Sequence, residues 1–146
     1  MPTLLETLAK PPKRATVCAD CVRLVDEEVH SKGGLSGLAI KGAYKLVKGF
    51  KPGFVPEIVD AMLDDFCKNL QPIVDDARAQ NRAISAFFTA NPSRVADALL
   101  AITDERAKRS SHGSVRSAYE RLRGVAKRNV EEAAPRVGTV IERHAT

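Results

Sequence analysis

The sequence predicts an all-α fold: one domain, a bundle of six or seven helices. Apolar residues recur at helical spacings of three and four along most of the chain, and strand-like alternation is nearly absent. The connections between helical segments are short, which favours antiparallel neighbours. With 146 residues, 44% of them hydrophobic, the chain is long enough to bury a core without disulfides or a structural metal.

Prolines and glycines divide the first part of the chain. Residues 3–10 carry a short helical pattern that stops at the Pro-Pro pair of residues 11–12, because proline disfavours helix in the residue before it. Residues 15–32 form the next helix, with a broad apolar stripe. The glycines at 33–34 end that helix, since glycine readily adopts the left-handed conformation found after helix C-termini.

A third helix is expected from its N-cap, Ser36, to about residue 48. Apolar residues at helical spacing form one side of this helix, which should face the core: Ala39, Ala43, Leu46 and Phe50. Another face carries Lys41, Lys45 and Lys48. Free N–H groups at a helix start attract anions, so a site for a phosphate or another acidic group, helped by Lys41 and Lys45, is an alternative to a simple glycine and serine cap.

Prolines also mark the following helices. Pro56 suits the first turn of a fourth helix, whose core face contains Ile58, Met62, Phe66 and Leu70, flanked by Val59, Leu63 and Cys67. Pro72 either kinks this helix or starts a fifth, which continues through Ile73, Ala77, Ile84, Phe87 and Phe88. Asn91 and Pro92 are a cap and a first-turn proline that open a sixth helix, with Val95, Ala98, Leu99 and Ile102 on its apolar face.

The clearest interior loop is the Ser- and Gly-containing segment 110–114. Ser114 caps a long last helix, whose apolar stripe contains Val115, Ala118, Leu122, Val125, Ala126, Val130 and Ala133. The stripe continues past Pro135, so we expect a long helix that is kinked or restarted there. We find no internal repeat and no linker, and interpret residues 1–146 as one helical domain.

Charge is unevenly distributed along the chain, which carries a net charge of +5. Residues 57–76 contain six acids and one base. Residues 106–128, the basic segment, contain one acid and eight bases: Arg106, Lys108, Arg109, Arg116, Arg121, Arg123, Lys127 and Arg128. Such an asymmetry is typical of a polyanion-binding surface, or of acidic and basic faces that meet within the protein or across a homo-oligomer.

The basic segment, with Lys41, Lys45 and Lys48, is the candidate polyanion-binding site, because binding nucleic acid requires cations that meet closely spaced phosphates. Only Tyr119 interleaves the basic run, so such binding would be weakly sequence-specific. The alternative is a solvated helix face that is neutralised locally. Pairs four residues apart, such as Lys127 with Glu131 and Arg128 with Glu132, would do this.

Cys18 and Cys21 have the spacing of zinc ligands or of a redox dithiol. They lie inside a predicted helix and not at its N-terminus, where the helix dipole would lower a thiol pKa. Cys67 and His30 would complete a four-ligand zinc site only by converging in space. We therefore expect the three cysteines to be small core residues, and keep a metal or small-molecule carrier built around them as a further hypothesis.

No catalytic signature is present. His30, His112 and His144 are the only histidines, and none lies beside a serine or cysteine in a nucleophile motif. Because His112 falls in the predicted loop and His144 near the C-terminal end, we expect both to be exposed bystanders. The sequence therefore predicts neither enzymatic activity nor a cofactor.

Four stretches of the sequence together carry a family resemblance. They are residues 32–44 (KGGLSGLAIKGAY), 51–56 (KPGFVP), 96–106 (ADALLAITDER) and 122–135 (LRGVAKRNVEEAAP). In these stretches the chain resembles a family of small bacterial all-helical proteins of unknown function. The resemblance implies a bacterial, cytoplasmic, stand-alone domain, and it carries over no activity and no site residues.

These observations favour a non-enzymatic helical interaction module that binds a protein partner or a second copy of itself. The first alternative is a nucleic-acid or other polyanion binder, and the second is a small-molecule or metal carrier. No apolar stretch is long enough to span a membrane, and the chain starts without the basic head and apolar core of a signal peptide. We therefore expect a cytoplasmic protein.

Overall fold

The computed structural model describes residues 2–145. Within this range, the side chains at positions 36, 115, 118, 122 and 124 are not described. Over these residues the chain is all-α, as predicted. The helices are α1 (Leu4–Leu8), α2 (Lys13–Ser31), α3 (Gly34–Phe50), α4 (Phe54–Ala79), α5 (Ile84–Ala90), α6 (Pro92–Arg109) and α7 (Gly113–Ala145). In the described part of the chain, no helix has both the length and the apolar character needed to cross a bilayer.

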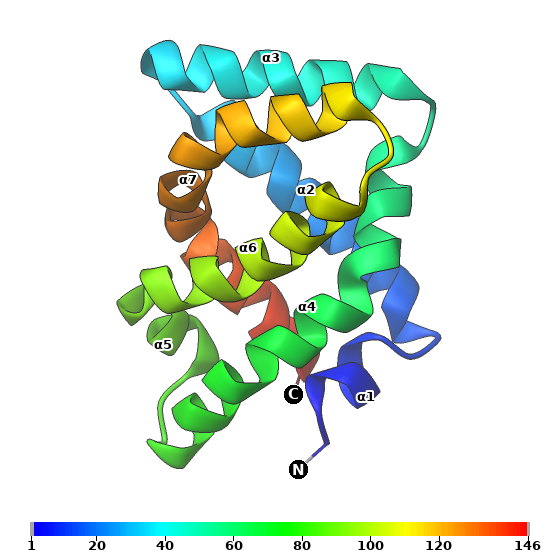
Figure 1. Ribbon diagram of the computed structural model, residues 1–146. Helices are drawn as coiled ribbons and strands as arrows, with labels where there is room; N and C mark the ends of the chain where they lie inside the picture. The colour runs from blue at the N-terminus through cyan, green and yellow to red at the C-terminus, as the bar shows by residue number, and fades with distance from the viewer. Residues whose placement is uncertain (1, 146) are drawn as a thin grey trace.

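The helices form a bundle whose central elements are α4 and α7, and α4 packs against α1, α2, α3, α5 and α6. α7 packs against α1, α2, α5 and α6. Figure 1 shows α3 at one end of the molecule, whereas α1 and both chain termini lie at the other end. The core between them contains fully buried side chains from α1, α2, α4, α5 and α6, namely Leu4, Val17, Ile73, Val74, Phe88 and Val95.

Several predicted helix boundaries are confirmed by the backbone. Asn91 is the N-cap of α6 and Pro92 occupies its first turn. α2 ends at Ser31, before the glycine pair, but no left-handed glycine caps it as predicted: Lys32 and Gly33 are extended, and Gly34, with a φ of 71°, is the first residue of α3. α7 continues through Pro135 as one helix. Figure 1 shows that the helix changes direction on its way to the C-terminal end. A proline inside a helix explains such a bend, because it interrupts the backbone hydrogen-bond ladder.

Other boundaries were predicted wrongly. Both serines expected as N-caps lie inside helices, because α3 begins at Gly34 and α7 at Gly113. α4 continues through Pro72 to Ala79, so residues 73–77 and 84–88 do not share a helix. The chain leaves α4 at Asn81, which has a φ of 55°, and hydrogen bonds from Asn81 N to Arg78 O and from Arg82 N to Ala77 O close a Schellman motif.

The apolar row of α3 is the main error in the predicted core. Leu46 and Phe50, expected to face inward, are 78% and 65% exposed, and Ala39 is exposed as well. The opposite side of α3 faces the bundle, where the Tyr44 hydroxyl donates a hydrogen bond to the Asp26 carboxylate of α2. The predicted start of the α7 stripe, Val115, Ala118 and Leu122, lies outside the described side chains.

A glycine sets the distance between α5 and α7. A Cβ added at Gly138 would lie 2.9 Å from the Cβ of Phe88 and 2.9 Å from the Cα of Ser85, closer than carbon atoms pack. Phe88 is fully buried and cannot move outward without opening the core. Gly138 therefore permits the close approach on which the α5–α7 contact depends.

A buried ion pair fastens the end of α7 to α2. His144 Nε2 lies 2.6 Å from Asp20 Oδ2, and Arg143 Nη1 lies 3.2 Å from the same oxygen. Asp20 and His144 are both buried, so the prediction that His144 is an exposed bystander was wrong. The hydrogen bond from His144, with the help of Arg143, lowers the pKa of the Asp20 carboxyl despite its burial.

Replacing Gly138 by alanine should destabilise the fold, because either α5 or α7 must shift. We expect Gly138→Ala to cost about 1–3 kcal/mol, the usual cost of overpacking a core. Gly42→Ala is the matched control: it also adds one methyl group within a helix, but into open space, and should be neutral or slightly stabilising. Urea unfolding followed by circular dichroism measures both, and equal stability of the two variants would contradict the packing described.

Removing the Asp20 carboxylate should make the free energy of unfolding change less as the pH is lowered from 7. The lowered pKa means that the carboxylate stabilises the fold above its unfolded pKa, and that this contribution disappears as pH falls through the folded pKa. Asp20→Asn should therefore lose about 3 kcal/mol at pH 7 and progressively less at acid pH. Asp97→Asn, which breaks an exposed pair with Lys127, should change unfolding by under about 1 kcal/mol. A constant difference between wild type and Asp20→Asn from pH 7 to pH 2 would refute this role.

Candidate ligand cavity

A partly open apolar cavity of about 340 Å³ lies inside the bundle. Its walls come from α1, α2, α4, α6 and α7, with Ile40 contributed by α3. Most of the lining side chains are aliphatic, and Phe66 adds an aromatic ring. Leu4 and Leu8 of α1 and Ile40 of α3 belong to opposite ends of the molecule in Figure 1, so the cavity extends along the bundle.

Four polar residues take part in this otherwise apolar lining: Glu28, Lys32, Thr103 and Asn129. Lys32 lies at the junction of α2 and α3, and its Nζ is 3.1 Å from Glu28 Oε2 and 2.6 Å from Glu132 Oε2. Burial opposes the charged form of this lysine, but hydrogen bonds to Glu132 and Glu28 outweigh it and raise the Lys32 pKa. One part of the cavity wall is therefore polar, with the Lys32 ammonium held between two carboxylates.

Cys21 and Cys67 line the cavity, whereas Cys18 lies beside Asp60 with its Sγ 3.6 Å from Oδ1. Burial raises the pKa of the Cys21 thiol to about 12 and that of the Cys67 thiol to about 11, and desolvation and Asp60 also raise that of Cys18. Protonated thiols are poor metal ligands and nucleophiles. Among the described residues, no group of three or more His, Cys, Asp or Glu side chains is arranged to hold a metal ion.

The cavity thiols should react slowly while the protein is folded. At pH 8 we expect Cys21 and Cys67 to react with iodoacetamide at least about a hundredfold more slowly than the same residues in the unfolded chain, because so little thiolate is present. Peptide mapping of samples alkylated in buffer and in guanidinium chloride measures each site. Rapid labelling of Cys21 in the folded protein would contradict its burial in this wall.

The basic segment is divided between the end of α6 and the start of α7, and four of its cations have an ion-pair partner among the described side chains. Arg109 pairs with Glu105, Arg123 with Asp104, Lys127 with Asp97 and Arg128 with Glu132. The expected Arg128–Glu132 pair is therefore present, whereas Lys127 reaches across to α6. The Arg123 guanidinium lowers the pKa of the Asp104 carboxyl, and Tyr119 donates to the same carboxylate.

Lys108, Arg116 and Arg121 are exposed. In α3, Lys41 and Lys45 are exposed too, and Lys48 lies 3.9 Å from Asp26. The candidate cations therefore occupy separate helices and are partly neutralised by local carboxylates. Binding of a polyanion through them stays a prediction.

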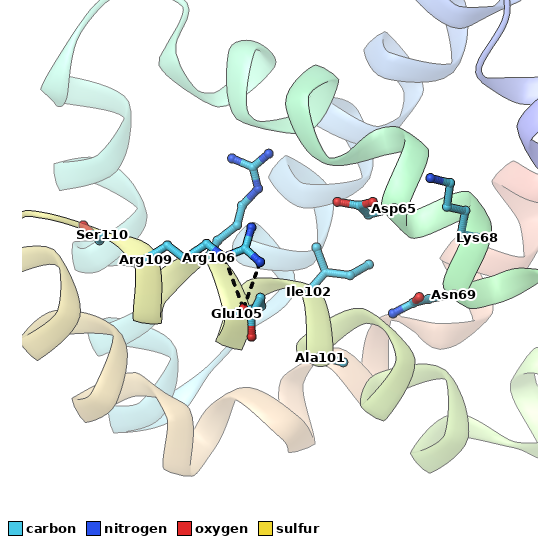
Figure 2. Close-up of a pocket in the computed structure, with 9 residues that line it drawn as sticks. All are labelled: Asp65, Lys68, Asn69, Ala101, Ile102, Glu105, Arg106, Arg109 and Ser110. Carbon is cyan, nitrogen blue, oxygen red and sulfur yellow. Dashed lines mark hydrogen bonds and ion pairs between the residues drawn. The ribbon is translucent and has the colours of Figure 1, made fainter.

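The acidic and basic segments meet at one cleft between α4 and α6, shown in Figure 2. Asp65, Lys68 and Asn69 of α4 line one side, and Arg106 and Arg109 line the other. Arg106 donates to the Ala61 carbonyl oxygen at 3.1 Å. Other acids of residues 57–76 have different partners: Arg14 of α2 binds Asp60 and Asp64, and Arg94 binds Asp76. With both charge signs on its walls, this cleft matches a single anionic ligand less well than the apolar cavity matches an apolar one.

The remaining histidines form no catalytic arrangement. His30 Nδ1 lies 2.7 Å from the Asp26 carbonyl oxygen, one turn earlier on the same helix, and His112 is exposed in the loop before α7. The buried Asp20–His144 pair is a titratable cluster that the sequence reasoning missed. No local signal could have found it, since 124 positions separate the two residues.

The fold and its interior define the class of protein: an all-α bundle with an apolar cavity between its helices. The chain belongs to a family described as "Family of unknown function (DUF6918)", whose family model matches residues 4–145. No curated protein and no solved structure matches the chain.

Proposed function

We propose that this protein binds a small, mainly apolar molecule inside the bundle and acts as its carrier. The observation that carries the proposal is the cavity, whose volume of about 340 Å³ falls within the range of small-molecule sites. Such sites are typically apolar with a few polar groups that orient the ligand. The lining of leucines and valines, with Lys32 and Glu28 on the wall, fits this pattern.

The apolar surface of the cavity supports the same conclusion. A ligand that covers the apolar walls of this partly open cavity removes them from water, which stabilises the bound state by about 25 cal/mol for each Å² of apolar surface buried. An occupant would therefore contribute substantially to the stability of the folded chain.

The composition of the wall indicates the class of ligand. Hydrocarbon suits the part of the cavity near Leu4, Leu8 and Leu70, where no charged side chain lies on the wall. At another part of the wall, Lys32 and Glu28 form a charge-paired polar end that can exchange hydrogen bonds with a polar head group. A medium-chain fatty acid combines these two properties and is the appropriate probe.

Two adjacent alanines of α7 provide a matched test of this function. Ala133 lines the cavity, whereas its neighbour Ala134 is fully buried in packed core away from the lining. Isothermal titration should show saturable binding of dodecanoic acid to the wild type, and Ala133→Leu should weaken it at least about tenfold by filling the site. Ala133→Leu should unfold no more readily than the wild type, whereas Ala134→Leu should cost about 1–3 kcal/mol through overpacking and still bind the acid.

Two results would overturn the proposal. The first is the absence of saturable dodecanoic acid binding to the wild type. The second is equal affinity of the wild type and Ala133→Leu, which would place the ligand outside the cavity.

A further inference from the structure

The outer side of α3 is a continuous apolar surface. Leu35, Leu38, Leu46 and Phe50 are 87%, 68%, 78% and 65% exposed, respectively. Helical spacing places all four on one side of the helix, with Gly42 between them. Contiguous apolar surface of this kind marks a site of contact with another molecule or with a membrane.

The patch continues beyond the end of α3. The Phe50 ring lies 4.9 Å from the Phe54 ring at the start of α4, centroid to centroid. Lys51 Nζ lies 5.7 Å from the centre of the Phe54 ring. An aromatic pair with a lysine beside it therefore closes one end of the apolar surface.

The charge of α3 has one sign. Its 17 residues contain Lys41, Lys45 and Lys48 and no aspartate or glutamate. Helical spacing places Lys45 at the edge of the apolar row and Lys41 one turn away on the same flank. A helix with an apolar side and a purely basic flank is complementary to an anionic interface, where lysine side chains reach the head groups while apolar side chains enter the acyl boundary.

We propose that α3 docks this protein on an anionic lipid surface. Leu35, Leu38, Leu46 and Phe50 enter the boundary of the bilayer, and Lys41 and Lys45 contact its phosphate groups. A second copy of the chain fits this surface less well, because pairing two α3 helices would bring their lysines together without a compensating acid on either helix.

The position of α3 makes such docking geometrically simple. The helix lies at one end of the molecule, and its inner side is held by α2 and α4, including the contact of Tyr44 with Asp26. The outer side can therefore meet a flat surface while the bundle stays folded. Ile40, on the inner side, lines the cavity, so this helix lies between the cavity and the lipid, although docking does not depend on the cavity being filled.

Vesicle flotation tests this proposal directly. The wild type should bind vesicles of phosphatidylcholine with about 30% phosphatidylglycerol and should bind pure phosphatidylcholine vesicles far more weakly. Leu46→Asp should reduce binding at least about tenfold, since it removes an inserted side chain and adds a negative charge. Lys41→Gln and Lys45→Gln should each reduce binding about fivefold at low salt.

A double variant at the opposite end of the molecule controls for net charge. Lys10→Gln with Arg82→Gln removes two exposed cations near α1 and the α4–α5 turn, and should leave vesicle binding within about twofold of the wild type. Leu46 is exposed, so Leu46→Asp should keep the wild-type melting temperature.

Three outcomes would overturn the proposal. They are no binding of the wild type to anionic vesicles, equal binding by wild type and Leu46→Asp, and a loss of binding in the Lys10/Arg82 control as large as in the α3 lysine variants. A wild-type dimer in light scattering that Leu46→Asp dissociates, without vesicle binding, would instead assign this surface to a second copy of the chain.

Discussion

The close packing of α7 on α5 is the constraint on which the rest of the structure depends. Gly138 allows contact with Phe88 and Ser85 that no larger residue permits, and Ala134 is fully buried one turn earlier. At the C-terminal end of the same helix, Asp20 binds both His144 and Arg143. The second half of α7 is therefore fixed in position by small residues on one side and by a buried ion pair on the other.

The cavity lies along another side of the same helix. Gly138 packs closely on α5, but Val130 and Ala133, together with residues beyond Pro135 such as Val137 and Ile141, line a space that the leucines of α2, α4 and α6 do not fill. Apolar walls that stay open to water contribute less hydrophobic stabilisation than packed ones. Binding a ligand there would supply that stabilisation, which links the packing of the fold to the proposed function.

Sequence reasoning succeeded where the signal is local. Pro92 and Asn91 mark the start of α6, and the apolar spacing of Met62, Leu63, Cys67 and Leu70 identified the buried face of α4. The capping box of α1, in which Thr3 and Glu6 bond reciprocally, follows a four-residue pattern that could have been identified as well.

The failures concern contacts between distant parts of the chain. The row containing Leu46 and Phe50 has the same periodicity whether the bundle or an external surface covers it, so the pattern could not orient α3. Asp20 and His144 meet only because α2 and α7 pack together. The cavity depends on the relative positions of several helices, none of which is encoded in the spacing of apolar residues.

The central claim is that the interior of this bundle holds a small apolar molecule. Native mass spectrometry of the protein purified without detergent, compared with its mass after denaturation, tests it most directly. We expect a complex heavier than the chain by one small organic molecule, which is lost on denaturation. If the purified chain is bare, it should acquire one equivalent of dodecanoic acid when the acid is added. A native mass equal to that of the bare chain, unchanged by the added acid, would contradict it.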